Sequence, residues 1–175
     1  VDPVIMAQAV FIEAAAQPVG DPADHPVSRR RNQWASAEQM TEHFSMRSPY
    51  AAWDPAVLAD YCRWGLLPAA DGEGLELACP PRLEASTYLG AACNDPYHLL
   101  GRIACPVTVL RARTGERQGP LDFSLSPTNP ALASAFAQAR DVQWADQSHF
   151  IPMEAPARLA ALIAGELAAD MMGTA

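Results

Sequence analysis

The sequence predicts an α/β fold, in which a small parallel sheet is covered by helices. Half of the 175 residues are hydrophobic, so the chain has enough apolar material for a core. From residue 105 onward, runs typical of strands alternate with runs typical of helices. Because this alternation is the pattern of parallel strands joined by right-handed crossovers, it decides the fold class.

The last third of the chain carries this alternation. Pro106–Leu110 is a β-branched run behind a proline, which predicts a buried strand. After a loop rich in Gly, Pro and Ser, Asn129 and Pro130 predict the start of a helix. Asp141–Trp144 predicts a second strand, and residues 145–152 predict a loop. Apolar residues at helical spacing then predict a closing helix from residue 157 to about residue 171.

The first hundred residues are predicted to be largely helical. Ser36 with Gln39 three residues later forms a capping box, and Asp54 before Pro55 is typical of a helix start. Further helices are predicted over residues 4–16, 81–88 and 94–100, with one short extended segment over residues 75–78. We therefore place two domains, residues 1–100 and residues 101–175.

Charge and hydropathy exclude several classes of partner. Twelve Lys and Arg against 20 Asp and Glu give a net charge of −8, which argues against a nucleic-acid or anionic-membrane surface. The basic run Arg29–Arg31 is flanked by acidic residues and is interpreted as a solvated turn. No apolar stretch approaches the roughly 18 residues of a membrane span.

Four cysteines are scattered without a C-x-x-C pair, so the spacing of a zinc site is absent and buried free thiols are expected. No positively charged segment precedes the apolar N-terminal residues, and we expect a cytoplasmic protein. Because the sequence opens Val1-Asp2-Pro3, we also expect it to be a piece of a longer protein.

A family resemblance rests on three segments. Residues 105–111 read Cys-Pro-Val-Thr-Val-Leu-Arg, residues 141–144 read Asp-Val-Gln-Trp, and residues 148–156 read Ser-His-Phe-Ile-Pro-Met-Glu-Ala-Pro. With the predicted helices, they resemble the C-terminal end of α/β-hydrolase-fold enzymes. The resemblance implies a partial α/β-hydrolase fold, with a helical cap plus the last parallel strands and helices of the core sheet.

The N-terminal part fits the same resemblance. Val1–Ile5 looks like the end of the sixth strand of that fold, and residues 4 to about 100 would be its lid or cap. One pattern in this region is similar to cap segments of esterase-like and carbon–carbon-bond hydrolase-like members: Pro80, Pro81, Glu84, Ala85 and Tyr88.

The resemblance also implies a catalytic triad in the order nucleophile, acid, base. His149 follows the last strand and is the expected general base. The acid stays open between Glu116, which follows the preceding strand, Asp122 farther along the same loop, and Asp2. The sequence contains no G-x-S-x-G nucleophile elbow.

Four aromatic residues are candidates for an apolar substrate pocket, although a simple core role is the alternative for each: Trp34, Phe44, Trp53 and Phe150. The other histidines lie too far apart in the sequence to indicate a metal site, and the resemblance implies no cofactor.

Two functions follow. The first is hydrolysis of a small ester or related acyl substrate, of which this sequence holds the half with the base but not the nucleophile. The second is a non-catalytic fragment or subunit that completes its sheet by pairing with a missing N-terminal half or another copy of itself, because unpaired strand edges invite such pairing.

Overall fold

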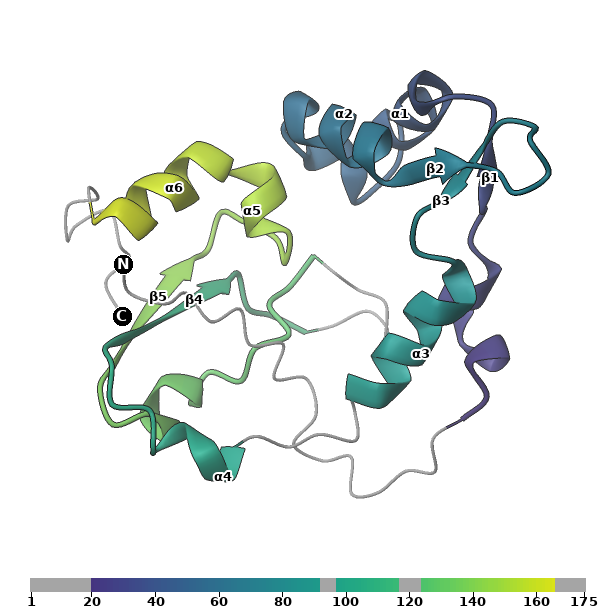
Figure 1. Cartoon of the computed structure of the whole chain (residues 1–175). Coiled ribbons are helices and arrows are strands. Elements are labelled where there is room, and N and C mark those ends of the chain that lie inside the picture. The colour runs from purple at the N-terminus through teal and green to yellow at the C-terminus, as the bar shows by residue number, and fades with distance from the viewer. Residues whose placement is uncertain (1–19, 92–96, 117–123, 166–175) are drawn as a thin grey trace. The chain divides into compact units, whose positions relative to one another are not determined.

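The computed structural model describes residues 20–91, 97–116 and 124–165 (Figure 1). The described residues fall into two compact units, each considered by itself. We call residues 20–91 the N-terminal unit and residues 97–165 the C-terminal unit. The helix expected over residues 4–16, and residues 94–96 of the helix expected over 94–100, lie outside the described residues.

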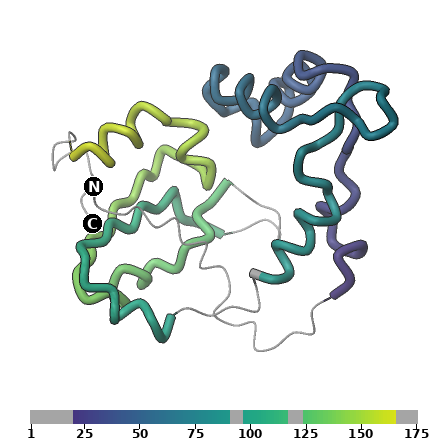
Figure 2. The backbone as a smooth tube through the Cα atoms, in the orientation of Figure 1, coloured from purple at the N-terminus to yellow at the C-terminus, as the bar shows by residue number. Residues whose placement is uncertain are grey.

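The C-terminal unit is built around a parallel strand pair, as predicted. Its elements in chain order are α4 (Tyr97–Leu100), β4 (Val107–Ala112), the 3-10 turn η4 (Leu132–Ala135), β5 (Ala139–Trp144), α5 (Ile151–Glu154) and α6 (Pro156–Ala164). Strands β4 and β5 pair in parallel from Val107 opposite Ala139 to Ala112 opposite Trp144. Figure 2 follows the backbone through β4, η4 and β5 to α6.

Each face of this pair is covered by a different apolar cluster. On one face, β4 buries Val107 and Val109 against α4 and η4; the buried members of this cluster are Leu100, Val107, Val109, Leu132 and Phe136. On the other face, both strands pack against α5 and α6; the buried members are Ala112, Val142, Trp144, Ile151 and Leu162. This division follows from the alternation of side chains along a strand. The pair therefore lies between two layers, as a parallel sheet requires.

The prediction of an α-helix after Asn129 and Pro130 is wrong, because the segment forms a 3-10 turn. The Asn129 side chain accepts a hydrogen bond from the Ala131 N–H (2.8 Å), but only the single 3-10 turn η4 follows. Phe136 is already extended (φ −96°, ψ 152°), and it is buried beside β4. Since β5 begins at Ala139, opposite Val107, the segment has room for one turn only.

The closing helix is shorter than predicted. Helix α6 ends at Ala164, because Gly165 adopts the left-handed conformation (φ +75°) and its N–H caps the carbonyls of Ala161 and Leu162. The part expected beyond residue 165 lies outside the described residues. The loop predicted over residues 145–152 ends earlier, since α5 begins at Ile151.

The N-terminal unit contains the predicted helices. Its elements are η1 (Pro22–Asp24), η2 (Pro26–Arg29), β1 (Gln33–Trp34), α1 (Ala37–Ser45), η3 (Tyr50–Ala52), α2 (Pro55–Trp64), β2 (Leu66–Pro68), β3 (Leu75–Leu77) and α3 (Pro81–Ala91). Both predicted caps are confirmed. Ser36 accepts a hydrogen bond from the Gln39 N–H (3.2 Å), and Asp54 accepts one from the Ala56 N–H (2.8 Å).

A small antiparallel sheet in this unit was only partly predicted. Strand β3 was expected, but it pairs on one side with β1 and on the other with β2. The described part of this unit is still largely helical, and the small sheet adds to the predicted elements. Gly74, which precedes β3, has φ +75°, and a Cβ atom at this position would lie 2.8 Å from the carbonyl oxygen of Trp34.

Two predictions about exposure were wrong. The run Arg29–Arg31 is not a uniformly solvated turn, because Arg30 is half-buried and forms an ion pair with Glu84 on α3 (2.6 Å). Of the cysteines expected to be buried, only Cys62 is buried among those described, while Cys79 and Cys105 are exposed; all three are free thiols. Both exposed cysteines lie just outside the strands, where the chain turns at the surface.

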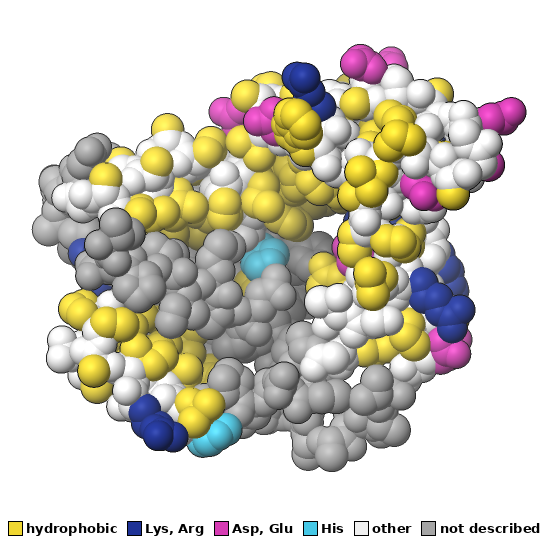
Figure 3. Space-filling model, in the orientation of Figure 1, with side chains coloured by type: hydrophobic (Ala, Val, Ile, Leu, Met, Phe, Trp, Pro, Cys, Tyr) yellow, Lys and Arg dark blue, Asp and Glu magenta, His cyan; other side chains and the backbone are white. Residues whose placement is uncertain are grey.

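On the face that Figure 3 shows, the basic side chains lie in small separate patches. Large hydrophobic side chains are also exposed; in the N-terminal unit they are Met46, Trp64, Leu67, Leu83 and Tyr88. Within the residues that the structure describes, no helix is both long enough and apolar enough to cross a membrane.

Candidate active site

Two loops meet at the carboxyl ends of β4 and β5. The backbone N–H of Arg113, the first residue after β4, donates to the carbonyl of Gln147, which lies in the loop after β5 (3.1 Å). This bond joins the loop that carries Glu116 to the loop that carries His149. In parallel sheets, ligands bind outside the carboxyl ends of the strands, so this edge is the candidate site.

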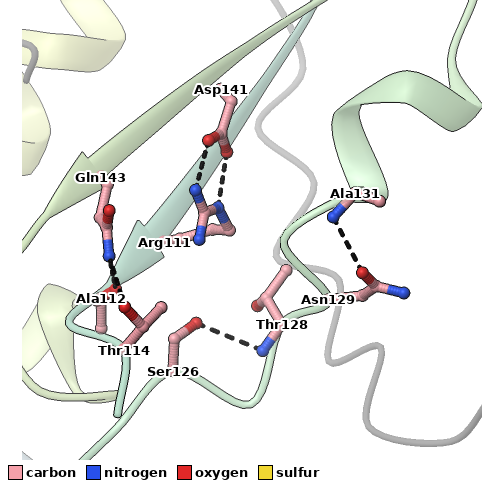
Figure 4. Close-up of polar contacts among 9 residues, drawn as sticks. All are labelled: Arg111, Ala112, Thr114, Ser126, Thr128, Asn129, Ala131, Asp141 and Gln143. Carbon is pink, nitrogen blue, oxygen red and sulfur yellow. Dashed lines mark hydrogen bonds and ion pairs between the residues drawn. The ribbon is translucent and has the colours of Figure 1, made fainter. Parts of the chain in front are cut away.

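Side chains hold the first of these loops to the sheet. The Gln143 amide on β5 donates to the Ala112 carbonyl and to the Thr114 hydroxyl, both at 3.3 Å (Figure 4). Farther along, the Ser126 N–H donates to the carbonyl of Arg113 (2.7 Å). Glu116 itself is exposed. The loop is therefore fixed at its base while its acidic side chain faces water.

An ion pair lies directly behind the loops, within the strand pair. Arg111 on β4 donates through two nitrogens to both carboxylate oxygens of Asp141 on β5 (Figure 4). Only 8 % of Arg111 is exposed, and its hydrogen bond to Asp141 raises the pKa of the guanidinium above its usual value. Such a fork ties the two strands together in a fixed geometry.

The loop after β5 is held by a carboxylate on α5. The backbone N–H of Ser148 donates to Glu154 Oε2 (2.9 Å), and the Ser148 hydroxyl donates to Glu154 Oε1. The same hydroxyl oxygen accepts a hydrogen bond from the Phe150 N–H (3.2 Å). His149 lies between these two residues and is half-buried, with its ring centroid 5.3 Å from that of Phe150.

A second contact holds the start of this loop. Arg158 on α6 donates to both oxygens of Asp146 (3.1 and 3.0 Å), and its guanidinium lies 4.0 Å from the centroid of the Trp144 ring. A hydrogen bond from Gln147 and the contact with Arg158 lower the pKa of the Asp146 carboxyl. The loop is thus fixed on both sides of His149.

The structure brings together some of the predicted site residues. His149 and Phe150 are neighbours in one loop, and the loop that bears Glu116 is hydrogen-bonded to it. Asp2 and Asp122, the two alternative acids, lie outside the described residues. The choice among the three acids stays a prediction.

The remaining candidates, Trp34, Phe44 and Trp53, belong to one aromatic cluster in the N-terminal unit. Phe44 lies 5.5 Å from Trp34 and 4.2 Å from Tyr50, measured between ring centroids, and Tyr50 lies 4.8 Å from Trp53. Trp34 and Trp53 are only 3 % and 7 % exposed. Their burial fits the core role that was the alternative to substrate binding.

A polar network borders this cluster. Arg30 donates to Glu84 and to the hydroxyl of Tyr61 (2.9 Å). Burial, followed by the neighbouring Tyr61, raises the pKa of Tyr50 to about 12. Among the described residues, no group of three or more His, Cys, Asp and Glu side chains is arranged to hold a metal ion.

The hydrogen bonds between Ser148 and Glu154 were not predicted from the sequence. Both lie in the segment that carries the family resemblance, one immediately before His149 and the other five residues after it. Their spacing alone indicated no hydrogen bond, because they lie six residues apart across the start of α5.

Comparisons with known proteins agree with this fold. No family model and no curated protein matches the sequence. Among solved structures, the chain is similar to the crystal structure of E-2-(acetamidomethylene)succinate hydrolase, with a TM-score of 0.56 and 14 % sequence identity. The match covers 76 % of this chain and 46 % of that one, so the chain spans less than half the length of its structural neighbour. The chain therefore has part of an α/β-hydrolase fold.

Proposed function

We propose that this chain supplies the general base of an α/β-hydrolase-type site that acts on a small ester or related acyl substrate. The observation that carries the proposal is the position of His149. It lies on a fixed loop at the carboxyl end of β5, and that loop is joined by a hydrogen bond to the loop after β4. The likeness to a hydrolase structure supports the same reading of the fold.

In the proposed mechanism, the His149 imidazole takes a proton from the nucleophile as it attacks the acyl carbon. It then returns that proton to the leaving group. A carboxylate orients the ring and stabilises the imidazolium; the candidates are Glu116, Asp122 and Asp2. No cofactor takes part in this scheme. Because the sequence holds no G-x-S-x-G elbow, the proposal places the nucleophile on residues outside this sequence.

The substrate proposal rests on the apolar residues near the site. Phe150 adjoins His149, and we propose that it contacts an apolar part of the substrate. The aromatic cluster of the N-terminal unit, which holds Trp34, Phe44 and Trp53, is left out of this substrate proposal, because the burial of Trp34 and Trp53 fits a core role.

The test is hydrolysis of short-chain acyl esters by the native protein and its variants. His149→Gln is expected to lower kcat by about a thousandfold or more, since removal of a triad member has effects of this size. His98→Gln is the matched control, because His98 is an exposed histidine of the same unit. It is expected to keep kcat within about twofold. Equal rates for both variants would overturn the assignment of the base.

A second candidate function is a non-catalytic subunit that associates through its sheet. The supporting observation is that β4, in the part of the chain described, pairs with β5 alone. A lone pair of strands is marginal in water, and parallel strands expect further neighbours. The proposed partner is a missing N-terminal half or a second copy of the chain.

Sedimentation combined with an ester-hydrolysis assay distinguishes this candidate from the first. Association is expected to give a particle heavier than the 18.8 kDa chain, together with no hydrolysis of any acyl ester. A well-folded monomer at all concentrations would contradict it.

A further inference from the structure

We propose that Glu154, acting through Ser148, is a positioning residue for His149. This role rests on the proposed function, in which His149 is the base, and it gives that base a dedicated support. Its physical basis is the closed set of hydrogen bonds around residues 148–150, which can be measured without any catalytic activity.

The geometry concentrates three bonds on one short segment. The Glu154 carboxylate receives both donors of Ser148, its backbone N–H at 2.9 Å and its hydroxyl. The hydroxyl oxygen in turn accepts the backbone N–H of Phe150 at 3.2 Å. His149 is therefore held between two residues whose backbones are both tied, directly or through one hydroxyl, to the same carboxylate.

The carboxylate is the group that suits this arrangement. Two donors converge on Glu154, and an ionised carboxylate offers two acceptor oxygens and no donor. An amide of the same shape offers one acceptor and two donors, so it leaves one Ser148 donor without a partner. Ser148 is only 6 % exposed, so water does not fully replace a hydrogen bond that one of its donors loses.

The position of Glu154 makes the support rigid. Glu154 is the last residue of α5, and the N–H of the next residue, Ala155, donates to the Ile151 carbonyl (2.9 Å). Ile151, the first residue of α5, is buried in the cluster between the sheet and α6. The carboxylate thus lies on a helical turn that is packed against the core, and its hydrogen bonds hold the loop in a fixed position relative to that core. Catalytic groups need support of this kind, because small displacements from the productive geometry are costly to rate.

The contact between Asp146 and Arg158 provides a matched control. It also ties the loop after β5 to a helix through a carboxylate, but it lies three residues before His149. The Asp146 side chain is 60 % exposed. Asp146→Asn therefore makes the same chemical change as Glu154→Gln at another carboxylate that holds the loop, without touching the bonds around His149.

The experiment is nuclear magnetic resonance of the whole 175-residue chain. Amide hydrogen exchange is measured at Ser148 and Phe150, together with the chemical shifts and line widths of the His149 ring, at one fixed pH. The ring signals are assigned with His149→Gln. The variants are Glu154→Gln, Ser148→Ala, their combination, and Asp146→Asn.

The expected result is specific to the segment. Glu154→Gln speeds exchange at Ser148 by about tenfold or more and shifts or broadens the His149 ring signals. Ser148→Ala does the same at Phe150. Because the two residues act as one unit, the double variant moves the His149 signals no farther than the larger single effect. Asp146→Asn leaves both amides within about twofold of the unaltered chain.

Two results overturn the proposal. One is an unchanged His149 ring signal in both Glu154→Gln and Ser148→Ala, with the circular dichroism spectrum showing a folded chain. The other is an equal response to Asp146→Asn, which would mean that any loop contact has the same effect. Ser148→Ala removes no charge and little volume. If Glu154→Gln reduces the fraction of folded protein, the His149 ring signal of Ser148→Ala therefore tests the proposal.

A kinetic arm separates positioning from simple stability. In the native hydrolytic protein, Glu154→Gln is expected to lower kcat by about 10- to 100-fold and to leave KM within about twofold. A loss that resides in KM contradicts a role in orienting the base. If no ester is hydrolysed, the proposed function fails, while the resonance measurements still show whether Glu154 positions His149.

Discussion

Arg111 is a buried charged side chain that is paired with one carboxylate, that of Asp141. Its guanidinium lies inside the C-terminal unit, and both of its contacts to Asp141 are charged hydrogen bonds. The strands β4 and β5 that carry them also lead into the two loops of the candidate site. A change in this ion pair therefore acts on the stability of the unit that supports the site.

Asp141→Asn is predicted to lower the free energy of unfolding by about 2 kcal/mol, because it leaves a buried cation with a neutral partner. The Asp141 side chain is 34 % exposed, so water compensates for part of the lost interaction. Urea unfolding monitored by tryptophan fluorescence measures the change. Asp146→Asn is the comparison, and its more exposed pair predicts a loss below about 1 kcal/mol. A larger loss for Asp146→Asn would contradict this reading.

Tyr50 predicts a dependence of stability on alkaline pH. Burial raises its pKa from 10.0 to about 12 in the folded protein. Below pH 10 the phenol is protonated in both states and its contribution is fully present. As pH rises from about 10 to about 12, the unfolded chain loses the proton first, so the folded state loses stability.

Tyr50→Phe is therefore predicted to flatten the fall in unfolding free energy across that window. Urea unfolding at several pH values between about 9 and 12 measures it. An unchanged slope in Tyr50→Phe would show that the phenol titrates alike in both states.

Contacts of a residue with its near neighbours in the sequence were predicted correctly, and contacts between distant residues were not. Ser36 and Asp54 were predicted as caps because each contacts backbone two or three residues away. Arg30 was misjudged, because its partner Glu84 lies 54 residues farther along the chain. The place of His149 after the last strand followed from the order of elements and the resemblance.

At the scale of elements, the turn before β3 shows how backbone geometry shapes the small antiparallel sheet. Gly72 and Gly74 both have positive φ, +80° and +75°. A Cβ at Gly72 would meet nothing within 4 Å, whereas one at Gly74 would lie 2.8 Å from the Trp34 carbonyl oxygen. The two glycines therefore separate conformational strain from steric contact.

Gly72→Ala is predicted to lower the free energy of unfolding by about 1 kcal/mol, the cost of a left-handed alanine. Gly74→Ala is predicted to cost at least about 2 kcal/mol, because the strand pair β1 and β3 must also move apart. Thermal or urea unfolding of both variants checks the order. Equal losses would mean that the steric contact between a Cβ at residue 74 and the Trp34 carbonyl oxygen does not lower the free energy of unfolding.

The elements themselves were predictable where their pattern was long. Strand β4 and helices α1, α2 and α3 carry caps, prolines or periodicity that identify them. Strands β1 and β2 have only two and three residues, too few to show an alternation. The turn η4 looked like a helix because its composition favours one, and only the register of β5 against β4 limits it to a single turn.

In the whole molecule, the candidate residues fall into two separate units. The C-terminal unit carries His149, Phe150 and the loop of Glu116 at the end of its parallel strand pair. The N-terminal unit gathers the aromatic candidates into one cluster. The fold class followed from the sequence because alternation and the C-terminal segments are local patterns. The choice of the acid did not, since Glu116 and Asp122 lie in the same loop and Asp2 lies far from both in the sequence.

We propose that this chain brings the base, while the nucleophile belongs to residues outside its sequence. Native mass measurement of each particle that hydrolyses an acyl ester, with and without His149→Gln, tests it most directly. Activity is expected only in a particle heavier than 18.8 kDa, and it is expected to fall by about a thousandfold in the variant. Activity in an 18.8 kDa monomer, or activity that survives His149→Gln, would contradict it.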